Sequence, residues 1–150
     1  MTNIIMPTHP WITHIEGTLY KQTFPSDCST EDLAAYLQAI EQLVFQINEP
    51  YAFVIDLGGI ISTSSEQRRL TAESDKRQRD HDKEFCAGVA YYAKAAWTRG
   101  LVTAVYWLQP PVYPYEMFSD QREAENWARQ RLRDRGAVIG GEVTSEKASH

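Results

Sequence analysis

The chain has 150 residues, of which 43% are hydrophobic and 23% are charged, as in an ordinary globular protein. This length predicts a single domain that buries enough surface to form a core without disulfides. A formal net charge of -5 gives no basic footprint for nucleic acid or for an anionic membrane. The composition therefore argues against a protein that binds nucleic acid.

Three features of the sequence predict a cytoplasmic protein. Cys28 and Cys86 are its two cysteines, and isolated thiols are typical of a reducing compartment. The first ten residues lack the basic and apolar regions of a signal peptide. Nowhere do about 18 apolar residues run together, as a membrane-spanning helix requires. We therefore expect no membrane insertion.

Residues 11–20 alternate between apolar and polar side chains. Trp11, Ile15 and Leu19 share one parity of this segment. A period of two predicts one half-buried strand, typical of an edge of a sheet.

An amphipathic helix follows a loop at residues 25–29. Ser29 or Thr30 begins it, and acidic residues fill its first turn, where the helix dipole favours them. Apolar residues then recur every three or four positions, which predicts a helix that covers a sheet face. These residues are Leu33, Leu37, Ile40, Val44 and Ile47. Pro50 ends the helix because proline disfavours helical geometry in the residue before it.

A continuous apolar strand over residues 52–57 contains one charged residue, Asp56, near its end. Strands buried on both faces have this pattern, so we expect a central parallel strand. The next helix, from Ser65 to about Glu84, is almost entirely polar, with Leu70 as an apolar anchor. We interpret it as a solvated helix of which only the first turns are docked.

The second half of the chain repeats this order. An apolar strand over residues 85–92 precedes a helix over 95–108, which carries a wide apolar stripe. The stripe consists of Trp97, Leu101, Ala104, Val105 and Leu108. A short last strand at 115–118 and a final helix, capped at residues 119–120, complete the pattern.

Alternating strands and helices predict a single α/β domain with a mostly parallel sheet of four to five strands and crossover helices. We assign residues 1–10 to an N-terminal arm and residues 11–135 to this domain. Residues 136–150 lose apolar periodicity, which predicts a flexible tail.

Two stretches resemble a known family. Phe-Val-Ile-Asp-Leu-Gly-Gly-Ile at residues 53–60 looks like the strand before the regulatory loop of STAS domains, the fold of anti-sigma-factor antagonists. Residues 86–111, 114–118 and 123–128 resemble small bacterial proteins described as STAS-like or CRAL-TRIO-like. Together the likeness covers roughly residues 11–132, and it implies an STAS-like fold and a non-enzymatic regulatory role.

The resemblance also implies a candidate phosphoacceptor. In the phosphorylated antagonists, Asp-Ser-Ser-Gly follows the strand, and its first serine accepts the phosphate. Laid on this chain, the pattern puts Ser64 at the aspartate and Ser65 at the acceptor, with Glu66 and Gln67 in place of Ser-Gly. The alternative role for Ser65 is to cap the following helix, which we favour.

The loop after the central strand is the main candidate surface, because such loops lie at the carboxyl ends of parallel strands. Asp56 at the strand end has two roles open to it, catalysis and capping of loop amides, and we favour capping. Gly58 and Gly59 lack the spacing of a nucleotide-binding loop and predict a tight turn with positive φ.

Three arginines extend this candidate surface. Arg68 and Arg69 lie in the first turn of the polar helix. Arg99 lies in an otherwise apolar helix, where it could bind an anion or a partner carboxylate. Its alternative role is a structural salt bridge to Asp56 or Glu66.

The sequence provides little for catalysis. No histidine lies near Ser62, Ser64 or Ser65 in sequence, so a hydrolase would need His14 or another base to approach them in space. No His/Cys spacing fits a zinc site, and we expect neither a metal nor a cofactor. His81 between two aspartates predicts an exposed helical patch.

We therefore expect a non-enzymatic regulatory or protein-interaction module with an unidentified protein partner. Tyr113 and Tyr115, flanked by prolines, form a second candidate surface that could pair with a second copy of the chain. The alternative is a carrier of an anionic or lipid-like molecule, which would need an apolar pocket of ~300 Å³ or more beside Arg99.

Overall fold

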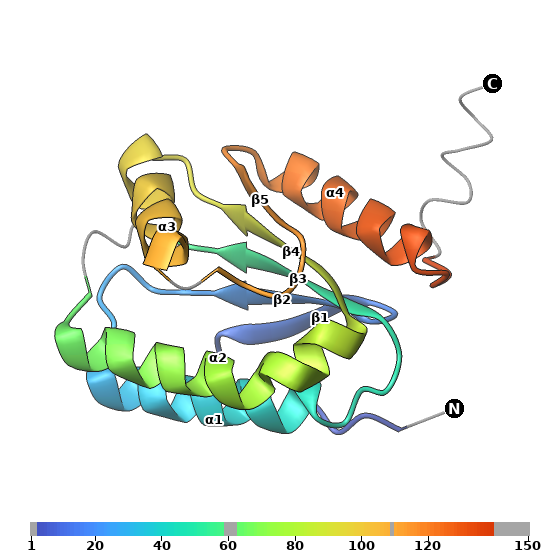
Figure 1. Ribbon diagram of the computed structural model, residues 1–150, viewed down its shortest axis with the longest axis horizontal. Coiled ribbons are helices and arrows are strands. Elements are labelled where there is room, and N and C mark those ends of the chain that lie inside the picture. The colour runs from blue at the N-terminus through green and yellow to red at the C-terminus, as the bar shows by residue number, and fades with distance from the viewer. Residues whose placement is uncertain (1–2, 59–62, 109, 140–150) are drawn as a thin grey trace.

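The computed structural model describes residues 3–58, 63–108 and 110–139, with the backbone alone at 104–108. Five strands and four helices form one α/β domain (Figure 1). Their bounds are β1 Ile12–Glu16, β2 Leu19–Thr23, α1 Thr30–Val44, β3 Tyr51–Asp56, α2 Ser65–Phe85, β4 Cys86–Tyr92, α3 Ala96–Leu108, β5 Tyr115–Phe118 and α4 Gln121–Asp134. The predicted order of elements is confirmed from α1 onward.

The strands lie in the sheet in their chain order, β1-β2-β3-β4-β5. β1 pairs antiparallel with β2, and the other three pairs are parallel, which confirms a mostly parallel sheet. The order never reverses, so the sheet has no switch point of the kind that opens a binding crevice in doubly wound folds. The location of a loop at the carboxyl edge of this sheet is therefore weaker evidence for a ligand site than it is in a doubly wound fold.

The single strand predicted over residues 11–20 is wrong. This segment is a hairpin in which Glu16 pairs with Leu19. Gly17, with φ of 53°, occupies the first position of the two-residue turn, where glycine adopts positive φ without strain. Ile15 and Leu19 are both apolar and keep the same parity across the turn. The alternation of apolar and polar residues therefore gives no sign that the strand ends at Glu16.

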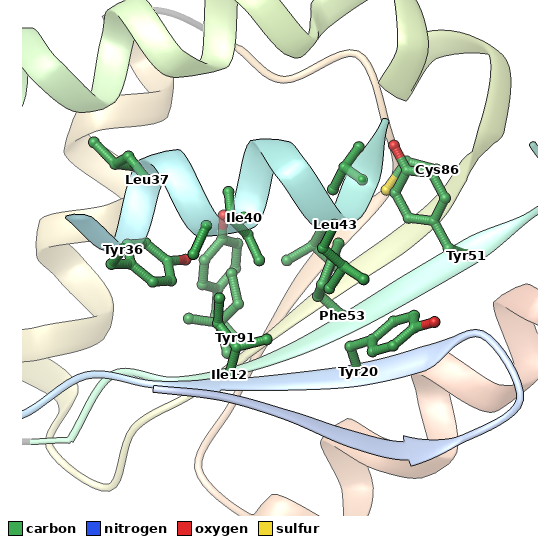
Figure 2. Close-up of a cluster of buried hydrophobic side chains, with 14 of the residues drawn as sticks. Ile12, Tyr20, Tyr36, Leu37, Ile40, Leu43, Tyr51, Phe53, Cys86 and Tyr91 are labelled. Carbon is green, nitrogen blue, oxygen red and sulfur yellow. The ribbon is translucent and has the colours of Figure 1, made fainter. Parts of the chain in front are cut away.

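Helices cover both faces of the sheet. α1 and α2 lie below it in Figure 1, and α4 lies above it. On β3, Tyr51, Phe53 and Ile55 belong to the core cluster between the sheet and α1. Ala52 and Val54 belong to the cluster between the sheet and α4. Figure 2 shows the first cluster, with side chains of α1 directed at the sheet. Two buried faces explain the continuous apolar run of this strand.

α1 begins as predicted and ends earlier. Ser29 caps it by accepting a hydrogen bond from the N–H of Asp32 at 3.0 Å. The helix ends at Val44, three residues before the predicted apolar face does, although Ile47 is still buried. The apolar pattern therefore predicted burial correctly and overextended the helix.

The apolar stripe of α3 is displaced at its start. Trp97 is 62% exposed and Thr98 only 2% exposed, so the predicted burial of Trp97 is wrong. Leu101 is half-buried. The predicted positions at 104, 105 and 108 fall where side chains lie outside the described residues.

Packing continues past the predicted end of the domain at residue 135. Ile139 is 1% exposed and joins the core cluster beneath α4. The remainder of the predicted tail, residues 140–150, lies outside the described residues. Within the described part of the chain, no helix combines the length and the apolar character needed to cross a membrane.

Candidate functional site

The turn that leaves β3 is held by Asp56. Its Oδ1 accepts a hydrogen bond from the N–H of Gly58 at 2.9 Å, so the carboxylate caps the loop as favoured from the sequence. Gly58 has φ of 59°, and a Cβ there would lie 2.6 Å from the carbonyl oxygen of Phe24. The turn therefore needs glycine for both conformation and space. Gly59 lies outside the described residues.

Ser64, and not Ser65, caps α2. The Oγ of Ser64 accepts the N–H of Gln67 at 3.0 Å, and Oε1 of Gln67 accepts the N–H of Ser64 at 3.1 Å. This reciprocal pair is a capping box. The Ser-x-x-Gln spacing in the sequence is the signal of this capping box. The cap expected at Ser65 therefore lies one residue earlier, at Ser64. Gln67 also donates to the carbonyl oxygen of Cys28 at 2.8 Å, which ties α2 to the loop before α1.

Ser65 is exposed at the first position of the helix. Its Oγ accepts a hydrogen bond from Nη2 of Arg68 at 3.3 Å. Arg68 also donates through Nη1 to the carbonyl oxygen of Thr63 at 2.7 Å. The hydroxyl of Ser65 is thus accessible and lies beside a guanidinium.

Arg69 is exposed and pairs along the helix. It forms ion pairs with Glu66 at 2.6 Å and with Glu73 at 2.7 Å. The hydrogen bond from Arg69 lowers the pKa of Glu66 below its ordinary value. These contacts fix the pattern of charge on the first two turns of α2. Exposed pairs of this kind add little stability.

The candidate residues fall into two groups: Asp56 and Gly58 form the turn after β3, and Ser64, Ser65 and Arg68 lie at the start of α2. We call residues 63–69 the α2 start surface, and all of them except Gln67 are exposed.

Arg99 does not join the α2 start surface by any hydrogen bond or ion pair described for residues 3–58, 63–108 and 110–139. Its Nη1 donates to the carbonyl oxygens of Ala93 at 2.7 Å and Lys94 at 3.1 Å. It thereby holds the link between β4 and α3. The alternative role of Arg99, a structural salt bridge to Asp56 or Glu66, is not formed, since no ion pair in the described part of the chain includes Arg99.

The described histidines hold backbone groups. His14 Nε2 lies 2.8 Å from the carbonyl oxygen of Gly17, and His9 Nδ1 accepts the N–H of Trp11 at 3.2 Å. His81 Nε2 lies 3.0 Å from the carbonyl oxygen of Ile47. In the described part of the chain, no histidine contacts Ser64 or Ser65. The geometry therefore gives no support to a serine hydrolase.

A second polar cluster lies where the sequence predicted only solvent. Ser74 and Gln78 of α2 are buried, so the expectation that only the first turns of α2 are docked is wrong. Ser74 donates to Glu41 of α1 at 2.7 Å, and Gln78 donates to Ser74 at 3.0 Å. Arg77 forms an ion pair with Glu41 at 2.7 Å. Polar residues dock this helix because they find partners on α1.

The same contact continues to the amino ends of β3 and β4. Tyr51, which is 0% exposed, donates its hydroxyl to Oδ1 of Asp82 at 2.5 Å. His81 stacks on the Tyr51 ring, and Tyr51 lies beside Cys86 at one end of the cluster in Figure 2. His81 is thus half-buried, which corrects the expected exposed patch.

We call this contact the α2 seam. It consists of Glu41, Tyr51, Ser74, Gln78, His81 and Asp82. Its sequence signal is that Ser74, Gln78 and Asp82 share a helical face with apolar Leu70 and Phe85.

Two hollows open on this side of the molecule. An open groove of about 270 Å³ between α1 and α2 is lined by Ala34, Leu37, Gln38, Glu41, Leu70 and Arg77. A much smaller one is lined by Asp75, Arg79, Asp82 and residues 110–113. Tyr113 therefore lies over the α2 seam, while Tyr115 on β5 is 36% exposed. Neither hollow has Arg99 in its lining.

Comparison of the chain with protein-family models gave no match, and comparison with curated proteins gave none either. The fold and the two polar clusters therefore carry the functional argument.

Proposed function

We propose that the protein is a non-enzymatic regulatory or interaction module, STAS-like in fold, that binds a protein partner through the α2 start surface. The observation that carries this proposal is the bracing of an exposed polar surface. Asp56 holds the turn at Gly58, and the capping box and the bond from Gln67 to Cys28 hold the start of α2 in place. A surface ordered before binding loses less entropy when a partner binds.

The chemistry of the surface suits recognition of a charged partner. It presents Ser65, Glu66, Arg68 and Arg69 to solvent, and no histidine described here is placed to activate a serine. Guanidinium groups recognise carboxylate or phosphate groups well, and Arg69 would exchange its exposed ion pairs with Glu66 and Glu73 for those of a partner. We infer that the partner is an acidic segment of another protein.

Ser65 is the residue that we propose for phosphorylation. The hydroxyl of Ser64 is occupied by the N–H of Gln67, whereas the exposed hydroxyl of Ser65 lies beside Arg68. A phosphate at this helix N-terminus would be stabilised by the dipole and by that guanidinium. It would also repel an acidic partner, so phosphorylation is expected to release it. Mass spectrometry of protein from its native cell that never finds phosphate on Ser65 would remove this part of the proposal.

A second copy of the chain is a partner that the β5 edge could accept. Val89 donates to the carbonyl oxygen of Pro114 and Ala93 to that of Phe118. Backbone groups alternate along a strand, so those of Met117 face away from β4. Met117→Pro removes one outward N–H and leaves the β4 ladder intact. If β5 pairs with itself, this variant is monomeric by sedimentation at concentrations where the wild type is a dimer.

A carrier of an anionic or lipid-like molecule is the weaker candidate. It needs an enclosed apolar pocket beside Arg99, but the groove of about 270 Å³ is open and lies between α1 and α2. Native mass spectrometry that finds a retained small molecule, with no protein partner in a pull-down, would favour the carrier instead.

A pull-down from native lysate tests the module. We expect the wild type to retain a partner that Arg69→Ala loses, because this variant removes a guanidinium from the α2 start surface. Arg122→Ala is the matched control, since Arg122 is also exposed but lies on α4 across the sheet. Equal capture by all three proteins would refute the proposed surface.

A further inference from the structure

Two carboxyl groups, that of Asp82 in the α2 seam and that of Asp75 in the smaller hollow beside it, form no ion pair in the described part of the chain. Asp75 and Asp82 are seven residues apart on α2, so both lie on the face directed at the smaller hollow. Glu41 pairs with Arg77, but no ion pair described for residues 3–58, 63–108 and 110–139 includes Asp75 or Asp82. Asp82 instead accepts a hydrogen bond from the neutral hydroxyl of Tyr51.

We propose that the α2 seam is a pH-sensitive contact that tightens on acidification and lets the second half of α2 open as the pH rises from about 5 to 8. Ionised Asp82 carries a negative charge into a half-buried site. Protonated Asp82 removes this charge and still accepts the hydrogen bond from Tyr51. The proposal does not depend on what the α2 start surface binds.

The titratable and charged groups around Asp82 come from every element packed there. They are Glu41 of α1, Tyr51 of β3, Asp75, Arg77, Arg79 and His81 of α2, Cys86 of β4, Tyr113 of the segment before β5 and Arg135 at the end of α4, which bonds the carbonyl oxygens of Glu84 and Cys86. His81 opposes the effect, because a positive charge there favours ionised Asp82. Tyr51 and Cys86 are neutral in this range, since burial raises the pKa of both above their ordinary values.

The direction of the pH dependence follows from the surroundings of Asp82 in the closed and open forms of α2. Burial raises the pKa of Asp82 from an ordinary 3.8 to about 6, although the Tyr51 hydrogen bond opposes this. A carboxyl with a raised folded pKa contributes stability at low pH and loses it as the pH rises through that pKa. Opening of α2 returns Asp82 to solvent, so the open form gains on the closed form between pH 5 and pH 8. The expected increase in the opening constant is about tenfold.

Asp75 acts in the same direction. Partial desolvation in the smaller hollow raises its pKa, and the charges of Asp82 and Glu41 add to this shift. Its side chain is nevertheless exposed at the rim of the hollow, where water screens its charge. We therefore assign the main effect to Asp82. Glu41 does not interfere, because the hydrogen bond from Arg77 lowers its pKa and it stays ionised throughout this range.

Hydrogen exchange of the full chain at pH 5 and pH 8 tests the proposal. Exchange rates are divided by the intrinsic rates at each pH, and α4 serves as the internal reference. We expect the opening constant of residues 74–85 to rise about tenfold relative to α4 in the wild type. Asp82→Asn should remove most of this rise. Asp80→Asn, which makes the same charge change at an exposed position of the same helix, should keep it.

Two results would overturn the proposal. One is a wild-type opening constant that does not change with pH. The other is a rise that Asp82→Asn retains, because the rise would then belong to another group. If Asp82→Asn does not fold, the carboxyl ¹³C shift of Asp82 in the wild type decides. A midpoint near 6 supports the proposal, and a midpoint at or below about 4.5 refutes it.

Discussion

Gly58→Ala tests the turn on which the proposed surface depends. Gly58 has φ of 59°, and alanine in this left-handed region costs about 1–2 kcal/mol. The added Cβ would also lie 2.6 Å from the carbonyl oxygen of Phe24. That oxygen belongs to the backbone, which is itself bonded to β3 through the N–H of Phe24 and the carbonyl oxygen of Asp56 at 2.9 Å. The contact can be relieved only by moving the chain, at a further cost of about 1–3 kcal/mol.

We therefore expect Gly58→Ala to lower the free energy of unfolding by about 3 kcal/mol, or the melting temperature by about 6–12 °C at this size. Urea unfolding followed by circular dichroism measures it. Gly100→Ala is the matched control, because Gly100 lies in α3 and a Cβ added there would meet no atom within 4 Å. It should stabilise the protein by about 0.5–1 kcal/mol. A Gly58→Ala protein within about 0.5 kcal/mol of the wild type would refute the reasoning.

Four further substitutions, one of them a control, test the described contacts by urea unfolding. Ser64→Ala should cost about 1 kcal/mol through loss of the cap, while Ser65→Ala stays within about 0.5 kcal/mol, and the reverse order would place the cap at Ser65. Leu43→Ala at a fully buried position should cost about 2–5 kcal/mol, and a cost below about 1 kcal/mol would contradict the packing of α1. Gly88→Ala should cost about 1–3 kcal/mol, because its Cβ would lie 2.8 Å from Cγ of Arg131, and an unchanged stability would show that α4 can move away from β4.

Much of the fold could be predicted because burial has strong sequence signals. The apolar run of β3 is continuous since helices cover both faces of the strand, and that predicted a central parallel strand. The apolar face that begins at Leu33 predicted α1. Capping and turn residues were equally readable, as Asp56 and Gly58 show.

The errors have physical causes as well. The hairpin at Gly17 was missed because a two-residue turn keeps the alternation of apolar residues in phase. The docking of α2 was missed because a helix is predicted to be buried from its apolar residues, whereas α2 docks through polar residues that pair across the interface. Ser74 and Gln78 look solvated in the sequence, and the partner of Ser74 on α1 is 33 residues away along the chain. The bonds from Arg99 to the carbonyl oxygens of Ala93 and Lys94 were not predicted, because backbone acceptors leave no mark in a sequence.

The most direct test of the central claim is site-specific crosslinking in the native cell. A photoreactive phenylalanine derivative at Ser65 reports on the α2 start surface, and the same group at Asn126, exposed on α4, is the control. We expect one dominant crosslinked protein from position 65, lost when Arg69→Ala is added, and none from position 126. No crosslink at position 65 beyond that at position 126 would contradict an interaction surface there.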